Sequence, residues 1–409
     1  MLTSTEKEKL KNASQQAEPL EIKPMRIAML GTRGIPASYS GFENCAEELG
    51  VRLVERGHSV TVYCRSHHIR YSQPYYRGIR LVKIPTIRNK YFDTITHSFL
   101  SSVHAAFQDY DVLLFFIAGN APIAVAMHKL GQHVALNVDG LDWKRQKWNR
   151  SFAKKYLQYA ERISSKIGPG LITDSRVVEM YYRNTYNVES NFIPYGATIM
   201  RCAPGETLEK FGLEPNKYIL FVGRLVPENG PHHLVQAFQE LYNEGVTGDL
   251  KLVVVGDAPY QQKYIASLKS TSTPNIIFTG YVFGDGYREL SSNARLFAVT
   301  TEAGGTHPVL LESMAFGNCV IVNDTPDNLE VVSEAAVSYS GADGSADLKR
   351  KLRMLLENPG LLEHYRRAAV DRVSKNYDWQ MVTDAYEQLF ARLQTSRSVH
   401  SKAKLKTQV

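Results

Sequence analysis

The sequence predicts an α/β protein made of two doubly wound parallel sheets. Short apolar runs alternate with helix-like stretches along most of the 409 residues, and this alternation is typical of parallel sheets that helices cover on both faces. It is interrupted by a stretch rich in Pro and Gly around residues 191–206, where we place a linker. A chain of this length also corresponds to about two domains of ~100–200 residues.

The first unit begins with the apolar run MRIAML, which ends in the loop GTRGIP. A helix-like stretch at residues 43–56 follows, and after it comes the β-rich run SVTVYCR. This succession predicts a β-α-β unit. The same rhythm continues through the runs IRLVKIP, DVLLFFI and HVALNVDG. We therefore expect one domain over residues 25–198.

The second unit begins with KYILFVGRL, and its later strand-like runs are KLVVVGD, NIIFTGYV, RLFAVT and CVIVND. Helices are predicted between them at residues 233–242, 260–270 and 309–316. This order indicates a second Rossmann-like domain, over residues 199–376. The polar ends, residues 1–24 and 394–409, are expected to be a disordered extension and a basic tail.

Composition restricts the classes of function. Lys and Arg exceed Asp and Glu by 48 to 41, and this basic balance favours anionic partners such as sugar nucleotides, lipid phosphates or nucleic acid. No stretch has the ~20 apolar residues of a membrane span, and the first residues lack the apolar core of a secretory signal. The four cysteines form no Cys-x-x-Cys pair, which argues against structural zinc and a disulfide framework. A cytoplasmic protein fits these features.

Basic and aromatic residues are concentrated between Trp143 and Lys166. A solvated helix face explains this pattern, and so does a helix that lies on an anionic membrane surface. We predict peripheral attachment to anionic lipid. A role in nucleic-acid binding is the weakest interpretation, because no recognisable binding module surrounds the cluster.

Ligands of open α/β sheets bind at the carboxyl ends of the strands, where glycine lets backbone N–H groups approach phosphate. The loop after the first strand carries Gly31, Thr32, Arg33 and Gly34. It matches neither the dinucleotide-binding G-x-G-x-x-G nor a P-loop. We interpret it as an acceptor or phosphate loop, with a tight turn as the alternative.

A second loop of this kind contains Gly304, Gly305 and Thr306 and leads into a predicted helix that carries Glu312. The backbone amides of Gly305 and Thr306 would hold a diphosphate with the help of the helix dipole. Glu312, one turn into the helix, would point towards the ligand. A solvated surface position is the alternative for this glutamate.

Two more candidate residues follow strands. Arg224, after Gly223, places a cation where it would neutralise a diphosphate leaving group as charge develops. A surface salt bridge is its alternative role. Asp139 closes a strand of the first unit and would put a carboxylate on the facing wall, although helix capping explains it equally well.

Several blocks of the sequence also occur in one known family in the same order. They include IAMLGTRGIPASYSGFE, NVDGLDWKRQKW, LFVGRLVPENG, KLVVVGDAP and GGTHPVLLESMAFGNCVIVND, and the matched part covers about residues 25–393. The chain thereby resembles the retaining family-4 glycosyltransferases of the GT-B fold, in which two Rossmann-like domains face each other across a cleft. Within that family it is similar to the branch whose N-terminal domain occurs in rhamnosyltransferases of capsule and O-antigen synthesis.

The resemblance implies roles for the candidate residues. Arg224 would bind the donor diphosphate, Gly41 would approach it from the first domain, and Glu312 would hold the donor sugar. A helix at residues 377–393 would cross back to the first domain. The donor-binding set is Gly41, Gly223, Asn229, Gly304, Gly305 and Thr306, and the catalytic candidates are Arg224, Glu312 and Asp139.

Two positions depart from the wider family. The first glutamate of its E-x7-E pattern is replaced by Gly304, and Asn229 stands where a lysine usually follows Pro-Glu. Arg224 is then the principal cation for the diphosphate. No Asp-x-Asp motif stands at a strand end, so the resemblance implies catalysis without a metal or other cofactor.

The expected activity is transfer of a sugar from a nucleoside-diphosphate sugar to a hydroxyl acceptor with anomeric retention. The enzyme would be of the hexosyltransferase type, with a rhamnosyltransferase as one form of it. The acceptor would be a growing lipid-linked polysaccharide on the cytoplasmic face of the plasma membrane. The alternatives are a nucleotide-sugar epimerase of GT-B shape and a catalytically weak sugar-nucleotide-binding partner in a polysaccharide assembly complex.

Overall fold

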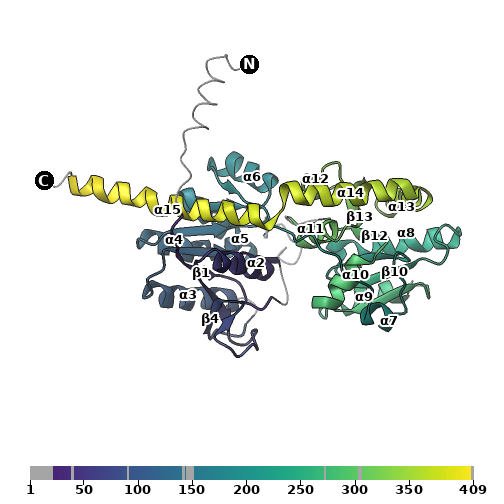
Figure 1. The fold of residues 1–409 in the computed structure, drawn as a ribbon, viewed down its shortest axis with the longest axis horizontal. Helices are drawn as coiled ribbons and strands as arrows, with labels where there is room; N and C mark the ends of the chain where they lie inside the picture. The colour runs from purple at the N-terminus through teal and green to yellow at the C-terminus, as the bar shows by residue number, and fades with distance from the viewer. Residues whose placement is uncertain are drawn as a thin grey trace, which may run out of the picture.

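The computed structural model contains two sheets, one from each half of the chain (Figure 1). It describes residues 22–37, 41–89, 92–140, 143, 152–270, 273–302 and 306–406, with side chains through residue 395. The predicted α/β architecture with two doubly wound parallel sheets is confirmed. No helix in these described ranges is long and apolar enough to cross a membrane.

The first sheet has the strand order β3-β4-β2-β1-β5-β6-β7-β8. Its strands are β1 (Arg26–Leu30), β2 (Ser59–Arg65), β3 (Tyr75–Tyr76), β4 (Ile79–Ile84), β5 (Val112–Phe116), β6 (Val134–Asn137), β7 (Leu171–Thr173) and β8 (Asn191–Phe192). The pairs are parallel except for β3 with β4. The short β5 run VLLFF is buried throughout, as expected of a strand covered on both faces.

Helices cover both faces of this sheet. They are α2 (Gly41–Glu55), α3 (Asp93–Ala106), η1 (Ala118–Asn120), α4 (Ala121–Lys129), α5 (Phe152–Ser164), η4 (Ser165–Gly170) and α6 (Arg176–Tyr186). Because successive strand residues point to opposite faces, Ile27 and Met29 of β1 join the core under α2. Ala28 and Leu30 join the core under α3 and α4.

The second sheet has the order β11-β10-β9-β12-β13-β14 and is parallel. Its strands are β9 (Tyr218–Val222), β10 (Lys251–Val255), β11 (Ile276–Gly280), β12 (Leu296–Val299), β13 (Cys319–Asn323) and β14 (Val337–Tyr339). The helices of this half are α7 (Glu206–Lys210), η5 (Pro227–Asn229), α8 (Pro231–Asn243), α9 (Gln262–Ser270), α10 (Gly284–Ser292), α11 (Pro308–Ala315), α12 (Pro326–Val332), α13 (Ser345–Glu357) and α14 (Pro359–Asn376).

The strand order reverses direction once in each sheet. In the first sheet the reversal lies between β1 and β5, and in the second it lies between β9 and β12. At such a point, the loops after two neighbouring strands run to opposite faces of the sheet. A space opens between these loops at the carboxyl edge, and ligands of these folds bind there. The loops after β1 and β9 are those singled out in the sequence.

The last helix, α15 (Trp379–Lys406), lies along the first unit (Figure 1). It packs on α2, the hydroxyl of Tyr386 accepts a hydrogen bond from Asn137 Nδ2 at 3.0 Å, and Glu387 Oε1 lies 2.7 Å from His58 Nε2. The helix continues to Lys406, into the segment expected to be a basic tail. The run QTSRSVHSKAKLK contains neither Gly nor Pro to end it.

Candidate functional site

The N-terminal ends of α2 and α11 meet between the two units. Gly41 begins α2, and a Cβ built on it would lie 2.6 Å from Cγ of Pro308, the first residue of α11. The helix ends approach this closely because Gly41 has no side chain. Each end carries the positive pole of a helix dipole and backbone N–H groups without helical partners, so their meeting point favours an anion.

Glu312 joins the two units one turn into α11. Its Oε1 accepts a hydrogen bond from Asn44 Nδ2 of α2 at 3.0 Å, and its Oε2 accepts one from the hydroxyl of Tyr287 in α10 at 2.7 Å. Burial raises the pKa of Glu312 above its usual range, although the hydrogen bond from Tyr287 acts in the opposite direction. The solvated surface position considered for Glu312 does not fit these contacts.

Thr306 also lies at the contact between the units. Its side chain is buried, and its Oγ1 donates to the backbone carbonyl of Asp174 at 3.3 Å. Asp174 directly follows β7 of the first sheet. The predictions for Gly304 and Gly305 fall outside the described residues.

The loop that carries Arg224 follows β9 and is fixed by its own backbone and by Asn229. The side-chain amide of Asn229 donates to the carbonyl of Arg224 at 2.8 Å, and the carbonyl of Asn229 accepts from Thr300 Oγ1 at 2.7 Å. A Cβ on Gly256 would lie 1.9 Å from the carbonyl oxygen of Gly223, so glycine permits this approach of two loops.

The guanidinium of Arg224 makes no hydrogen bond or ion pair with any residue that the structure describes. The surface salt bridge considered for it is therefore not formed within the described part of the chain. Because Arg224 follows β9 while Thr306 and Glu312 follow β12, these residues lie at the switch point of the second sheet. A half-buried cation at that edge is available to a ligand.

The loop after β1 is packed closely against its own sheet. A Cβ on Gly31 would lie 2.6 Å from the carbonyl oxygen of Phe116, and both Gly31 and Gly34 have positive φ angles. The N–H of Arg33 donates to Glu43 Oε1 at 2.8 Å, and that of Gly34 donates to Thr32 Oγ1 at 3.2 Å. These glycines thus serve the turn, and two of the loop amides already have acceptors within the protein.

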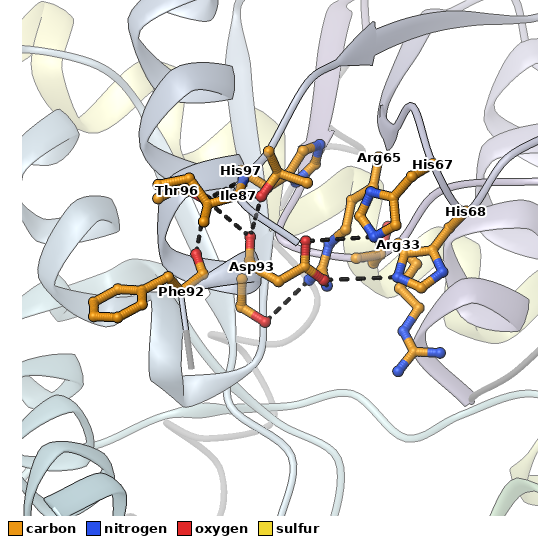
Figure 2. A network of polar contacts seen from close by, with 12 residues as sticks. Arg33, Arg65, His67, His68, Ile87, Phe92, Asp93, Thr96 and His97 are labelled. Atoms are coloured by element: carbon orange, nitrogen blue, oxygen red, sulfur yellow. Dashed lines mark hydrogen bonds and ion pairs between the residues drawn. The ribbon is translucent and has the colours of Figure 1, made fainter. Parts of the chain in front are cut away.

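Next to this loop, a polar cluster occupies the end of β2 and the start of α3 (Figure 2). Asp93 Oδ2 lies 2.6 Å from Nη1 of Arg65, and the Nε2 atoms of His67 and His68 lie 3.6 Å from its two oxygens. Burial and the positive charge of Arg33 lower the pKa of His68. Arg33 and the cluster thus lie at the carboxyl edge of the first sheet.

Two groups of described residues have the composition of a metal site. The first is His67, His68 and Asp93, and the second is His232, His233 and Glu302. In the first group a cation would be repelled by Arg65, which already binds the carboxylate. In the second, His232 Nδ1 lies 2.8 Å from the hydroxyl of Tyr264.

Asp139 lies beside Asp174, at the carboxyl ends of the neighbouring strands β6 and β7. Burial, together with the charge of Asp139, raises the pKa of Asp174 well above the usual range. The N–H of Asp139 donates to Asn137 Oδ1 at 3.2 Å, and its φ angle is 53°. The half-buried Asp139 and the buried Asp174 therefore form a carboxyl pair at the carboxyl edge of the first sheet.

Sequence reasoning missed three residues of this region: Asn44 and Glu330 join the two units, and Tyr287 acts within the second unit. Asn44 and Tyr287 hold Glu312, and the carboxylate of Glu330 in α12 accepts from the backbone N–H groups of Arg176 and Val177 at 2.8 and 3.2 Å. Glu330 thereby binds the N-terminus of α6. Of these, Asn44 directly follows the block IAMLGTRGIPASYSGFE, whereas Tyr287 and Glu330 lie outside the motifs described above.

Family models match both halves of the chain. Residues 206–372 match the family described as glycosyl transferases group 1, and residues 25–198 match a domain of unknown function, DUF1972. The second half is thus similar to glycosyltransferases. Among curated relatives, the capsular polysaccharide biosynthesis glycosyltransferase CapM of Staphylococcus aureus is 23% identical over 202 residues, which cover 46% of this chain and 52% of that protein. The chain spans about a third to a half of the length of the curated relatives it matches.

Solved structures resemble nearly the whole chain. Sucrose-phosphate synthase from Thermosynechococcus elongatus has a TM-score of 0.75 at 17% identity and covers 91% of this chain and 100% of its own. HepE of Anabaena in complex with UDP-glucose has a TM-score of 0.71 at 16% identity, with coverage of 91% and 100%. The chain has the GT-B fold.

Proposed function

We propose that this protein is a glycosyltransferase that moves a sugar from a nucleoside-diphosphate sugar to a hydroxyl group of a growing lipid-linked polysaccharide, with retention at the anomeric carbon. The observation that carries the proposal is the meeting of α2 and α11 at Gly41 and Pro308, with Asn44 bound to Glu312. This arrangement brings the positive ends of α2 and α11 to one point, beside the carboxylate of Glu312 on α11. The complex of HepE with UDP-glucose supports the class of donor.

The roles of the residues follow from their charges and positions. The helix ends of α2 and α11 and the guanidinium of Arg224 bind the donor diphosphate, whose negative charge increases as it leaves. Glu312, held in place by Asn44 and Tyr287, accepts hydrogen bonds from sugar hydroxyls at the remaining lone pairs of its carboxylate. The proposal needs no metal ion, because backbone amides and a guanidinium stabilise the leaving group.

The transfer step retains configuration when the acceptor attacks on the face from which the diphosphate departs. The bond between the anomeric carbon and the β-phosphate oxygen breaks, and the acceptor oxygen forms a new bond to that carbon. The acceptor proton passes to the departing phosphate oxygen. This route requires no pair of carboxylates acting as acid and nucleophile, and Asp139 shapes the acceptor side of the site.

The acceptor and its location are inferred from chemistry near the first sheet. The similarity to CapM supports a polysaccharide acceptor, and a hexosyl or rhamnosyl donor is the proposed sugar class. On α5, Phe152, Lys155 and Tyr159 are exposed, which supports peripheral attachment to the cytoplasmic face of a membrane. Residues 144–151 of the predicted basic segment lie outside the described residues.

One observation favours a second candidate function. Asn229 donates a hydrogen bond to the carbonyl of Arg224. The family that the chain resembles usually has a lysine at this position, so this site has one cation fewer for the diphosphate. A sugar-nucleotide-binding partner without turnover would tolerate this loss. Product analysis separates it from the proposed enzyme.

The test combines a donor screen with a transfer assay. Thermal shift across UDP-, GDP- and dTDP-sugars identifies the donor, because a ligand of the folded state raises its apparent stability. The purified protein then receives the labelled donor and a lipid-linked acceptor, and NMR of the product reports the anomeric configuration. We expect a glycosylated acceptor with retained configuration. Epimerised sugar without an acceptor product, or binding without any product, would refute the transferase.

A further inference from the structure

Helix α3 has its polar and apolar faces reversed relative to a helix that packs on a core. The buried side chains of its inner face are mostly polar: His97, Ser98, Ser101, Ser102 and Ala105. The exposed large side chains are apolar: Phe99 is 57% exposed, Leu100 41% and Val103 43%, and the flanking residues Phe92 and Phe107 are 55% and 83% exposed. Amphipathic surface helices normally show the opposite pattern.

The five exposed residues, Phe92, Phe99, Leu100, Val103 and Phe107, form what we call the α3 apolar stripe. Their spacing of three, four and seven residues places them on one side of the helix. Single exposed apolar residues are normal on protein surfaces, whereas a contiguous patch marks an interaction site. The α3 apolar stripe is therefore a candidate interaction surface.

The helices next to α3 on one side carry exposed positive charge. Helix α3 contacts α4, and α4 contacts α5, on the same side of the first sheet. The exposed cations of α4, α5 and η4 are Lys129, Lys155, Arg162 and Lys166. Exposed apolar side chains accompany them: Leu130, Phe152 and Tyr159. Among the described residues of α3, α4, α5 and η4 no carboxylate is exposed, since Glu161 is buried and Asp93 is held by Arg65.

We propose that the α3 apolar stripe inserts into the interfacial region of an anionic membrane, with the basic residues of α4, α5 and η4 on the lipid phosphates. Apolar and aromatic side chains beside a border of Lys and Arg are the composition of helices that lie in the plane of a membrane surface. Anionic headgroups complement the four cations. The inference rests on the proposed function only for the lipid-linked nature of the acceptor.

The α3 apolar stripe lies close to the edge of the first sheet where the acceptor is proposed to bind. Phe92 points away from the cluster of Arg65, His67 and His68, while the next residue, Asp93, is bound to that cluster (Figure 2). The lipid-facing stripe thus begins beside the carboxyl edge of the first sheet. A lipid-linked acceptor in the same membrane presents its headgroup to this edge without leaving the bilayer.

Sedimentation with vesicles tests the proposal on the full chain, without donor or acceptor. The vesicles are phosphatidylcholine alone, or phosphatidylcholine with about one third phosphatidylglycerol. The double variant Phe99→Gln/Phe107→Gln changes two exposed side chains, so the fold is kept. Its matched control is Tyr260→Gln/Met381→Gln, which removes two apolar side chains that are 65% and 49% exposed elsewhere. We expect binding to the anionic vesicles that falls about tenfold or more in the α3 variant and is unchanged in the control.

A fluorescence measurement reports insertion directly. In Phe107→Trp the new indole should be quenched by bromine-labelled acyl chains in anionic vesicles, beyond the quenching of the native tryptophans in the wild-type protein. Tyr260→Trp is the control and should show no additional quenching. If the vesicle-bound Phe107→Trp variant shows no more quenching than the wild type, the insertion of α3 is overturned.

Other outcomes also decide the matter. Equal sedimentation of the wild type and the α3 variant, or no vesicle binding by the wild type, overturns the proposal. Concentration-dependent dimers that the α3 variant abolishes, without vesicle binding, would assign the stripe to a second copy instead. A protein that glycosylates a soluble acceptor but ignores vesicles would lose this inference alone, whereas vesicle binding through α3 without any transfer would refute only the proposed function.

Discussion

The side-chain amide of Asn44 donates a hydrogen bond to Glu312 across the contact of the two units, at a distance of 3.0 Å. The two residues are 268 positions apart in the chain, and each lies in the first turns of a helix that follows a strand of its own sheet. This bond fixes the first unit relative to the helix that is proposed to hold the donor sugar. The strength of this hydrogen bond therefore affects how firmly the first unit and α11 are held together.

Asn44→Ala is expected to lower kcat/KM for transfer by roughly tenfold to a hundredfold. A hydrogen bond to a charged group contributes about 1.5–3 kcal/mol, and its loss removes a link between the units. Asn376→Ala is the control, because Asn376 Nδ2 donates only within α14. Steady-state kinetics on both variants check the expectation. Full activity in Asn44→Ala would show that this bond does not contribute to catalysis.

Gly41→Ala should separate the ends of α2 and α11, because its new Cβ would lie 2.6 Å from Cγ of Pro308. We expect donor binding to weaken about tenfold or more, since the diphosphate depends on both helix ends. Gly360→Ala is the matched control, with no atom within 4 Å of its Cβ. Calorimetric titration of the donor compares the two variants. Equal donor affinities in the two variants would show that the ends of α2 and α11 do not bind the donor diphosphate.

Asn229→Lys is expected to lower both the thermal stability and the activity. The substitution adds a cation, but it removes the hydrogen bond that holds the carbonyl of Arg224, worth about 1 kcal/mol. Asn229→Ala should lose the same stability without gaining charge. Tm and kcat/KM are measured together for both variants. A lysine variant more active than the wild type would contradict a structural role for Asn229 and favour the binding-partner interpretation.

The stability of the protein should depend on pH through Glu312. Burial raises the pKa of this carboxyl in the folded protein above its value of 4.5 in the unfolded chain. Between these two pKa values the folded state binds more protons than the unfolded state, so the free energy of unfolding falls as the pH rises. Glu312→Gln does not titrate at this position, so its Tm relative to the wild type should rise as the pH increases above 4.5. Thermal melts of both proteins at a series of pH values check this expectation. A Tm difference that is independent of pH would contradict the raised pKa of Glu312.

The sequence was sufficient to predict the two parallel sheets, because their strands are short apolar runs such as VLLFF between helix-like stretches. It also indicated Arg224 and Glu312 as candidates, since residues at strand ends and helix starts stand at fixed places in such a fold. The second sheet and the loops with glycine that follow its strands are predicted by the same local pattern.

The remaining features depend on contacts between distant segments. Tyr287 and Glu330 lie on helices without a motif. Tyr287 reaches Glu312 from another helix of the same unit, and the packing of the two units brings Glu330 to α6. The turn role of Gly31 depends on the approach of Phe116 from a strand far along the chain. The sequence does not predict the reversed faces of α3, because a periodic apolar pattern does not reveal which side of a helix faces the core.

The proposal depends most on a pyrophosphate bound by Arg224. Titration calorimetry with the nucleoside diphosphate of the identified donor measures this directly, in the wild type, in Arg224→Ala and in the exposed control Lys375→Ala, whose side chain is 68% exposed. We expect the Arg224→Ala variant to lose about a hundredfold to a thousandfold in affinity, as for loss of about 2.7–4 kcal/mol of anion stabilisation, while the control binds as the wild type does. Equal affinity in Arg224→Ala, or no nucleotide binding by the folded wild type, would contradict the account.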